Sequence, residues 1–583
     1  MSDASLRPNP AEEAAQQALE KVHKFILGRN SFRLEAGAGA GKTYSLIKAL
    51  KFILENQGAE LQRRCKKVAC ITYTNVATDQ ITAQTDGHPV VHSSTIHAFC
   101  WALIKSFQPV LREELPNIVE WSEKLNEIGG IGLRKIDYDL GHRRAKPDEQ
   151  EVYLGHDDVL TLMVALMGYK KFRNLLTTRF PILFIDEYQD TNRDFAQSML
   201  THFIDKGEGP LIGLFGDSWQ KIYGDGCGLI ENTRLEVIGK KANFRSVKNI
   251  VDVLNKMRPD LPQEVTDPDA TGSVIVYHTN NWPGERKPSG RGGHWEGDLF
   301  DDDAHRCLEL VRSLLEKQGW DFSPKKTKIL MLTHKVLATE QDYRKIAEIF
   351  RYNDSYIKKE NSYIAFLVDT VEPACLAYKE GRYGEMFSVL GSNLLKVKSR
   401  DDKIGWSEDM GKLLDIREQG TIGDVVDHIG NVKHLMLSDA VQRMEKELAD
   451  ASPAEIEASR GLKEINELRG VAYKELIALS NFLNDHTPFS TKHGVKGAEF
   501  ENVLIVLGRG WNRYNWNTFL EMSQNGVSED KIEFYESNRN LFYVACSRPK
   551  KRLALLFTQE LSDAALETLI SWFGENTIIA LSE

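Results

Sequence analysis

One segment limits the fold of this chain more than any other: the apolar residues 181–185, which end in the acidic pair Asp186 and Glu187. An apolar run of this length predicts a strand buried on both faces, which is typical of central parallel sheets. Ligands of such sheets bind at the carboxyl ends of the strands. There Asp186 is placed to hold Mg²⁺, and Glu187 to accept a proton from an attacking water. For an acidic pair considered by itself, a strand followed by an acidic turn is the simpler interpretation.

A glycine-rich loop lies upstream of this strand. Residues 32–36 read as a short strand, and the loop leads directly into a helical pattern. Glycines let backbone N–H groups surround phosphate oxygens at a helix N-terminus, a lysine reaches the β- and γ-phosphates, and a threonine hydroxyl binds Mg²⁺. The residues in these roles are Gly37, Gly39, Gly41, Lys42 and Thr43, while Ala36 replaces the first glycine of the general pattern. Such a loop alone also fits a tight turn, but together with the acidic strand end it predicts an NTPase.

The composition is that of a large globular protein. With 583 residues, 42% hydrophobic and 27% charged, the chain has room for about three or four domains. The net charge of −10 argues against a uniformly basic coat but allows a local basic groove. Seven cysteines form no CxxC pair, which predicts reduced thiols and no zinc or iron–sulfur cluster. Because the sequence shows no export signal and no long apolar run, we expect a cytoplasmic protein with no membrane partner.

Short apolar strands fall into two sets separated by helical stretches. The first set is residues 32–36, 68–72, 182–186 and 211–217, and the second is residues 273–278, 328–334, 502–507 and 553–558. Strands that alternate with helices predict an α/β fold with two parallel sheets. A long insertion interrupts each sheet. Residues 105–157 contain two strand patterns that suggest a small hairpin, and residues 351–484 read as mainly helical.

A series of motifs extends this pattern over nearly the whole chain. After the glycine-rich loop come residues 71–75 and 94–99, and the acidic strand end is followed by residues 216–223 and 243–246. The second half contributes residues 490–500 and 541–548. In this order the motifs resemble those of the superfamily 1 DNA helicases of the UvrD/Rep type, in a compact bacterial form.

The resemblance implies two RecA-like motor domains in tandem, each a parallel sheet with an inserted subdomain. Residues 1–104 and 158–260 would form the first domain (1A), and residues 105–157 its small insertion (1B). Residues 261–350 and 485–583 would form the second domain (2A), and residues 351–484 its mainly helical insertion (2B). ATP, with Mg²⁺, is then expected in the cleft between the two sheets.

The resemblance also assigns residues to the γ-phosphate. Arg245 and Arg548 would contact it, since arginine presents a fixed fork of donors to a phosphoryl group. Gln220 would sense the phosphate and couple it to DNA. A strand-like run at residues 542–545 precedes Arg548. The simpler interpretations are a surface arginine for Arg548 and a solvent-facing turn residue for Gln220.

Further residues are assigned by the resemblance to the nucleoside. Phe244 would stack near the adenine, and Glu499 would accept a hydrogen bond from the ribose. Gln17, with Gln16 as an alternative, would read the adenine edge. Core packing is the simpler interpretation of Phe244, and the polar face of a helix is that of the two glutamines.

The residues expected to contact nucleic acid are mostly uncharged and follow predicted strands, in loops. Hydroxyl, amide and imidazole groups suit phosphate contacts, and aromatic rings stack between unpaired bases. We expect sequence-nonspecific binding of single-stranded DNA or a 3′-tailed duplex, because no motif reads base edges. For His97, a structural role in the fold is the alternative to DNA binding. The residues are Tyr73, Thr74, Asn75, Thr95, His97, Tyr223, Thr491 and His493.

Two departures from the family pattern bear on function. Asp225 stands where close relatives have a tryptophan that stacks on a base, and a carboxylate would repel phosphate. Both insertions are also small, which puts strand translocation ahead of duplex unwinding. One hypothesis is an ATP-driven motor that moves 3′ to 5′ on single-stranded DNA. The other is a DNA-stimulated ATPase that acts with a separate nuclease in anti-phage defence or repair, as compact helicases of this type do.

Overall fold

The computed structural model describes residues 9–139, 143–222, 224–288, 296–391, 397, 399–492, 494–509 and 514–582. The chain forms two compact units. Residues 1–274, 519–552 and 567–575 belong to the first, and residues 275–518, 553–566 and 576–583 to the second. Among the described helices, none combines the length and the apolar character that a membrane span requires.

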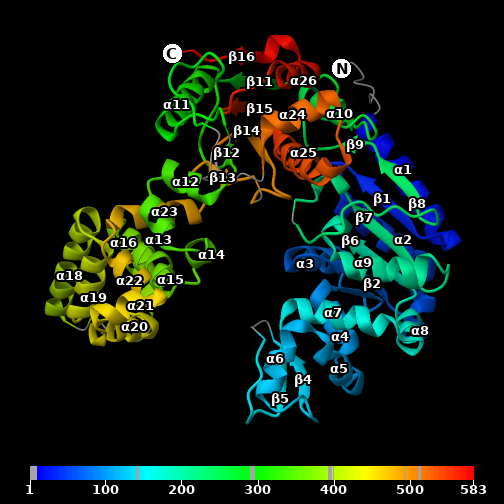
Figure 1. Cartoon of the computed structure of the whole chain (residues 1–583), viewed down its shortest axis with the longest axis horizontal. Helices are drawn as coiled ribbons and strands as arrows, with labels where there is room; N and C mark the ends of the chain where they lie inside the picture. Colours follow the sequence, from blue (N-terminus) through cyan, green and yellow to red (C-terminus); the bar gives the residue numbers. More distant parts are fainter. Residues whose placement is uncertain are drawn as a thin grey trace. The chain divides into compact units, whose positions relative to one another are not determined.

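A six-stranded sheet lies at the centre of the first unit (Figure 1). Its order is β3-β2-β6-β7-β1-β8, and every pairing is parallel, as the sequence predicted. The four strands expected from apolar runs are present, and two more lie at the edges of the sheet. The strands are β1 (Phe32–Ala36), β2 (Val68–Thr72), β3 (Val91–Thr95), β6 (Ile182–Asp186), β7 (Leu211–Gly216) and β8 (Glu236–Lys240).

Helices cover both faces of this sheet. The helices of this unit, of which α5 and α6 lie in the first insertion, are α1 (Pro10–Gly28), α2 (Lys42–Arg63), α3 (Asn75–Gln84), α4 (Ile96–Ile104), α5 (Gln108–Glu114), α6 (Val119–Glu127), α7 (His156–Met167), α8 (Lys170–Arg179), α9 (Arg193–Met199), α10 (Lys248–Met257) and α25 (Ile532–Cys546). Successive residues of a strand point to opposite faces, so each face has its own core. On β6, Ile182 and Phe184 pack with α1 and α2, whereas Leu183 and Ile185 pack with α4, α7 and α9. Burial on both faces explains the continuous apolar run before Asp186.

The first insertion differs from its prediction. Strands β4 (Lys135–Tyr138) and β5 (Glu151–Leu154) pair in parallel, with Lys135 opposite Glu151 and Tyr138 opposite Leu154. The expected hairpin is therefore wrong, because a hairpin would make the strands antiparallel. Residues 139–150 are long enough for the return path that a parallel pair needs. A second small pair, β9 (Ala242–Asn243) with β10 (Glu264–Val265), is also parallel.

The second unit contains another six-stranded sheet, in the order β13-β12-β14-β15-β11-β16. Strand β12 pairs in parallel with β13 and β14, and β11 pairs in parallel with β16. Two parallel-sheet domains in one chain are the tandem RecA-like arrangement that the sequence predicted. The elements of this part of the chain are β11 (Ser273–His278), α11 (Asp301–Lys317), β12 (Thr327–Met331), β13 (Phe489–Thr491), β14 (Phe500–Leu507), α24 (Trp516–Asn525), β15 (Pro549–Phe557), α26 (Asp563–Phe573) and β16 (Ile578–Ala580).

Helices fill the described residues between β12 and β13, and Figure 1 shows most of them gathered into one body. Their shared core includes Tyr343, Tyr363, Trp406 and Tyr473, all buried. An apolar core of this kind lets the helices hold together without the sheet. They are α12 (His334–Glu340), α13 (Arg344–Ile349), α14 (Asp354–Ile357), α15 (Ser362–Phe366), α16 (Glu372–Lys379), α17 (Tyr383–Leu390), α18 (Arg400–Gln419), α19 (Ile422–Asn431), α20 (Asp439–Asp450), α21 (Pro453–Ala458), α22 (Arg460–Arg469) and α23 (Tyr473–Leu483).

Candidate active site

The predicted phosphate loop connects β1 to α2 in the first unit. Strand β1 ends at Ala36 and α2 begins at Lys42, which places Gly37, Gly41 and Thr43 around the amino end of this helix. Gly39 and Gly41 have φ angles of +76° and +71°, where a side chain is disfavoured. The loop shape therefore depends on glycine at both positions.

The segment after β8 braces this loop. The Asn243 side-chain amide donates to the Ala38 carbonyl at 3.1 Å, and the Phe244 backbone N–H donates to the Gly39 carbonyl at 2.9 Å. Asn243 Oδ1 also accepts the backbone N–H of Arg245 at 2.9 Å. A β-carbon at Gly39 would lie 2.7 Å from that Oδ1 atom. Phe244 and Arg245 are thus fixed beside the phosphate loop.

Lys42, the first residue of α2, contacts Glu187, which directly follows β6. Its Nζ donates to Glu187 Oε2 at 2.6 Å, and Gln189 Nε2 donates to the same oxygen at 2.6 Å. Burial lowers the pKa of Lys42, but the charges of Glu187, Asp217 and Asp186 outweigh burial and raise that pKa. Burial, followed by the adjacent Glu187 charge, raises the pKa of Asp186 to about 7.

Glu187 has an unusual backbone. Its φ of +49° lies in the left-handed region, which is uncommon for residues other than glycine. This turn directs its carboxylate toward Lys42, while Asp186 remains the buried last residue of β6. The two acids therefore occupy different environments, as separate roles in metal binding and proton transfer require.

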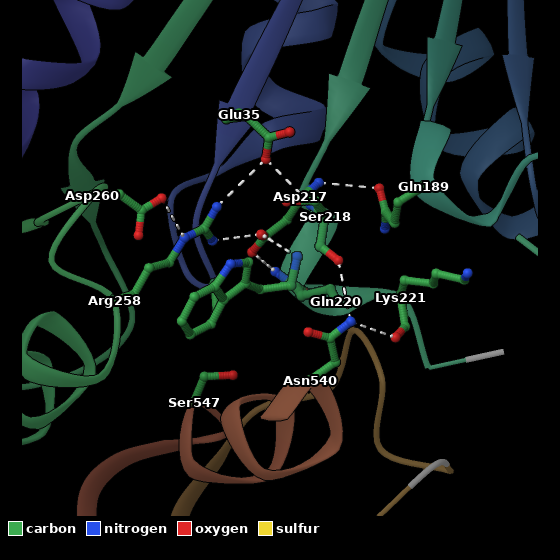
Figure 2. A network of polar contacts seen from close by, with 12 residues as sticks. Glu35, Gln189, Asp217, Ser218, Gln220, Lys221, Arg258, Asp260, Asn540 and Ser547 are labelled. Carbon is green, nitrogen blue, oxygen red and sulfur yellow. Dashed lines mark hydrogen bonds and ion pairs between the residues drawn. The ribbon is translucent and has the colours of Figure 1, made fainter. Parts of the chain in front are cut away.

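Gln220 lies in a short 3₁₀ turn, η4 (Ser218–Gln220), just after β7. Its side chain is buried and its Nε2 donates to Asp217 Oδ2 at 2.7 Å, so it is not a solvent-facing turn residue (Figure 2). Gln189 Oε1 accepts the Asp217 backbone N–H at 3.0 Å. Through Gln189, the turn that carries Gln220 is linked to Glu187.

Arg245 and Arg548 meet at Ser547. Arg245 Nη1 donates to the Ser547 carbonyl at 2.9 Å, and Arg548 Nη2 donates to the Ser547 hydroxyl at 2.7 Å. Arg548 is fully buried, which rules out the surface-arginine interpretation. Burial, and then the charge of Arg245, lower the pKa of Arg548 to about 9. Two arginines held this close are suited to an anion that needs more than one positive charge.

The strand predicted at residues 542–545 is wrong, because these residues belong to α25. A short apolar run does not distinguish a buried strand from a buried helix. Helix α25 and Arg548 lie in the same compact unit as Lys42, whereas the resemblance assigns them to the second domain. The lysine and both arginines are therefore part of one unit.

A cavity of about 940 Å³ opens beside the phosphate loop, on the side of α1. Gln16 and Gln17 both line it, together with Gly41, Lys240 and Phe244. The Phe244 ring is 44% exposed, so it is not a core-packing residue. The cavity brings together the predicted stacking ring and both candidate adenine readers. Glu499, the predicted ribose ligand, is an exposed residue just before β14 in the second unit.

On the predicted nucleic-acid side, Tyr73 and His97 line a cavity of about 140 Å³ that also reaches Asp186, Glu187 and Asp225. Tyr73 follows β2 and is 53% exposed. Burial, and then the neighbouring His156 ring 4.6 Å away, lower the pKa of His97. A neutral imidazole suits hydrogen bonding more than ionic phosphate binding.

Several of the predicted nucleic-acid residues are not in loops. Asn75 begins α3 and His97 lies in α4, while Thr95 and Thr491 are the last residues of β3 and β13. Thr74 caps α3, its Oγ1 accepting the Ala77 N–H at 3.2 Å. The loops are shorter than expected, because only two residues separate β2 from α3 and α4 begins directly after β3. Tyr223 and His493 lie outside the described residues.

The donor set fits Mg²⁺ at the phosphate loop. Thr43 offers a hydroxyl, and Asp186 offers a buried carboxylate whose ionised form a cation would stabilise. Across the described ranges, no group of three or more His, Cys, Asp or Glu side chains forms a ready-made metal cage. Mg²⁺ commonly uses one or two protein ligands together with phosphate and water, which matches the pair Thr43 and Asp186.

The sequence did not point to three residues that contact this site. Glu35 on β1 and Arg258 after α10 form a buried cluster with Asp217. Lys240 at the end of β8 donates to the Gly41 carbonyl at 3.0 Å and lines the larger cavity. A charged residue within a strand was an available signal for Glu35, which shares the buried strand β1 with Arg33, and for Lys240 in β8.

Comparisons with known proteins match the chain to two family models and one relative. A family model described as an AAA domain matches residues 19–225, and one described as a UvrD-like helicase C-terminal domain matches residues 304–560. The chain is 24% identical to the Gabija protein GajB of Bacillus cereus (strain HuB5-5), in an alignment of 723 positions that covers 99% of each chain. The first match contains Lys42 and Glu187, and the second contains Arg548. The chain belongs to the UvrD-like superfamily 1 helicases.

Proposed function

We propose that this protein hydrolyses ATP when it binds single-stranded DNA and uses the energy to move along that strand, 3′ to 5′. One observation carries the proposal: a continuous hydrogen-bond chain from the phosphate loop to the predicted sensor. Lys42 and Gln189 both donate to Glu187. Gln189 also accepts the N–H of Asp217, which in turn accepts from Gln220. Linked hydrogen bonds of this kind let a change at one end alter the geometry at the other.

In the proposed reaction, Glu187 accepts a proton from the water that attacks the γ-phosphate. Lys42 stabilises negative charge on the β- and γ-phosphates, and Arg245 and Arg548 stabilise charge on the γ-phosphate. Thr43 and Asp186 would hold Mg²⁺, which when bound supplies positive charge to the phosphate oxygens.

For nucleotide binding, we propose that the adenine enters the 940 Å³ cavity and stacks on Phe244. Gln17, or Gln16 beside it, would contact the edge of the base. Gly37, Gly39 and Gly41 would surround the phosphates with backbone N–H groups. Glu499 keeps its predicted role at the ribose.

For DNA binding, we propose that Tyr73 stacks on a base and that His97 contacts the strand nearby. Both line a cavity that extends to Asp186 and Glu187, which supports a direct path between DNA and the catalytic acids. Phosphate contacts are assigned to the polar residues at strand ends and helix starts. These are Thr74, Asn75, Thr95 and Thr491, with Tyr223 and His493 retained from the sequence.

A second candidate function is favoured by two observations. The relative named Gabija protein GajB aligns over 99% of both chains, and Asp225 lines the cavity where a stacking tryptophan was expected. In this alternative the protein is a DNA-stimulated ATPase that drives or regulates a separate nuclease subunit in defence or repair. Its action would be cytoplasmic in either case.

An ATPase assay with and without single-stranded DNA tests the proposal, and Lys42→Ala is the control. We expect DNA to stimulate hydrolysis in the wild type and no turnover in the variant. A strand-displacement assay on 3′-tailed and 5′-tailed duplexes then separates the two candidates. Displacement of the 3′-tailed duplex, or of streptavidin from the 5′ end of a biotinylated single strand, supports the motor. Stimulated hydrolysis without either displacement favours the regulator. No stimulation by DNA would refute both.

A further inference from the structure

A buried ion cluster lies next to the predicted sensor, and Figure 2 shows its members pointing toward one another. Arg258, which follows α10, donates from Nη1 to Asp217 Oδ1 at 2.5 Å. Its Nη2 atom lies 3.5 Å from Glu35 Oε2. The three side chains come from different parts of the sequence, and each is less than a tenth exposed. Arg33, also on β1, lies 3.3 Å from Glu35 Oε1 through its Nε atom, so the two carboxylates are buried with two guanidinium groups. Removal of these charges from water is costly, and apolar side chains could fill the same space without that cost.

Glu35 connects the strand that enters the phosphate loop to the segments that follow β6 and β7. The Tyr188 hydroxyl donates to Glu35 Oε1, and the Ser218 backbone N–H donates to Glu35 Oε2 at 3.2 Å. Tyr188 directly follows the proposed base Glu187, and Ser218 begins the turn η4 that ends in Gln220. Glu35 thus holds the backbone on both sides of the reaction centre.

Asp217 links the cluster to Gln220, because its carboxylate accepts hydrogen bonds from both Arg258 and Gln220. One carboxylate oxygen accepts from Arg258, and the other accepts from Gln220 Nε2 at 2.7 Å. An ionised carboxylate is an acceptor only, so it must face the NH₂ group of the glutamine. The carbonyl oxygen of Gln220 is then at the other end of the amide. Without Arg258, the charge on Asp217 that selects this orientation would lose its partner.

The cluster also holds the sensor turn against α25. The Trp219 ring of η4 is flanked by the guanidinium groups of Arg258 at 5.1 Å and Arg539 at 4.2 Å. Asn540 Nδ2 donates to the Lys221 carbonyl at 3.0 Å. Arg539 and Asn540 are on α25, the helix that ends just before Arg548.

We propose that Arg258 and Glu35 are positioning residues for the ATPase reaction, which orient the Gln220 amide and fix η4 against α25. The inference rests on the proposed function and extends it to residues that do not touch the nucleotide. If the inference is right, changes in the buried cluster lower kcat. If the cluster is purely structural, the same changes lower only the stability of the fold.

Glu35→Gln and Arg258→Lys test this inference, since each keeps the side-chain size while it removes a charge or the two-pronged fork. We expect kcat with saturating DNA to fall about tenfold or more, with the KM for ATP within about twofold, because the lost interactions act on the transition state. Arg143→Lys is the matched control. Arg143 also pairs with a buried acid, Asp158, at 2.7 Å, but in the first insertion. Its kcat should remain at the wild-type value.

A double-variant cycle supplies a readout that a structural role would not change. Gln220→Ala alone should lower kcat, and adding Glu35→Gln should lower it little further, because both changes remove the same orientation. Thermal unfolding of each variant shows whether the fold survives, and if Arg258→Lys does not fold, the Glu35→Gln cycle decides. Wild-type kcat in folded Glu35→Gln, or fully additive losses, would overturn the inference. Absence of DNA-stimulated turnover in the wild type would instead overturn the proposed function.

Discussion

Replacement of Glu187 by glutamine should stop hydrolysis while nucleotide binding and the fold are retained. Lys42 Nζ and Gln189 Nε2 both donate to the same oxygen, Oε2, at 2.6 Å. A glutamine carbonyl oxygen has two lone pairs and can accept both bonds. The substitution therefore keeps the local hydrogen bonds and removes the proton acceptor.

The size of the effect follows from the same contacts. Loss of a general base lowers a rate by about 10²- to 10⁴-fold, or roughly 3–5 kcal/mol of activation free energy. The Glu187 side chain is 30% exposed, so its ion pair with Lys42 contributes about 1 kcal/mol or less to stability. Loss of the Glu187 charge also relieves its repulsion of Asp186, which offsets part of that change. We expect the melting temperature to move by no more than about 2–4 °C.

The assay compares three quantities in Glu187→Gln and wild type: kcat with saturating single-stranded DNA, affinity for a fluorescent ATP analogue, and melting temperature. Glu113→Gln, on the exposed side of α5, is the control for a lost surface charge. The reasoning is refuted if kcat stays within tenfold of wild type. It is equally refuted if analogue binding weakens as much as kcat falls, since Glu187 would then act in binding.

Three further predictions concern the cavities and the first insertion. Burial lowers the pKa of Lys240 to about 8, so its ammonium is charged below that pH and neutral above it. ATP-analogue affinity should weaken by roughly tenfold as pH rises from 7 to 9, and a flat profile in Lys240→Gln checks the assignment. Tyr73→Ala should raise the DNA concentration for half-maximal stimulation about 5- to 100-fold, because stacking on a base is lost. Tyr169→Ala, the control, should leave this concentration unchanged. An unchanged value in Tyr73→Ala would show that Tyr73 does not contact DNA. Trp121→Phe loses the 2.9 Å hydrogen bond from Nε1 to buried Asp158 and should destabilise the protein by about 1–3 kcal/mol. The melting temperature should fall, while hydrolysis measured about 20 °C below the unfolding transition stays intact. An unchanged melting temperature would contradict a stabilising role for that bond.

Apolar pattern located the strands that are buried on both faces but missed those at the sheet edges. Strand β3 contains His92, Ser93 and Ser94, and its residues are all half-buried. Strand β8 exposes Glu236 and Val237. Edge strands bury less surface, so their sequences carry a weaker apolar signal.

The parallel pairing of β4 and β5 and the helical state of residues 542–545 were mispredicted for a related reason. For β4 and β5 the sequence indicates two strands but not the direction in which they pair. At residues 542–545 a short apolar run fits both a buried strand and a buried helix. The helix α25 contacts α10 and η4, which come from distant parts of the sequence, and tertiary packing chose between the alternatives there.

The sequence by itself determined the proposed chemistry of this protein, through a predicted phosphate loop ending in Lys42 and Thr43 and an acidic strand end at Asp186 and Glu187. Local rules suffice there, because backbone turns and side-chain types are set within a few residues. Tertiary structure alone decided the burial of Arg258 with Glu35 and Asp217. A buried charge is tolerated only where its partner is present, and these partners are brought together by the order of the strands in the sheet.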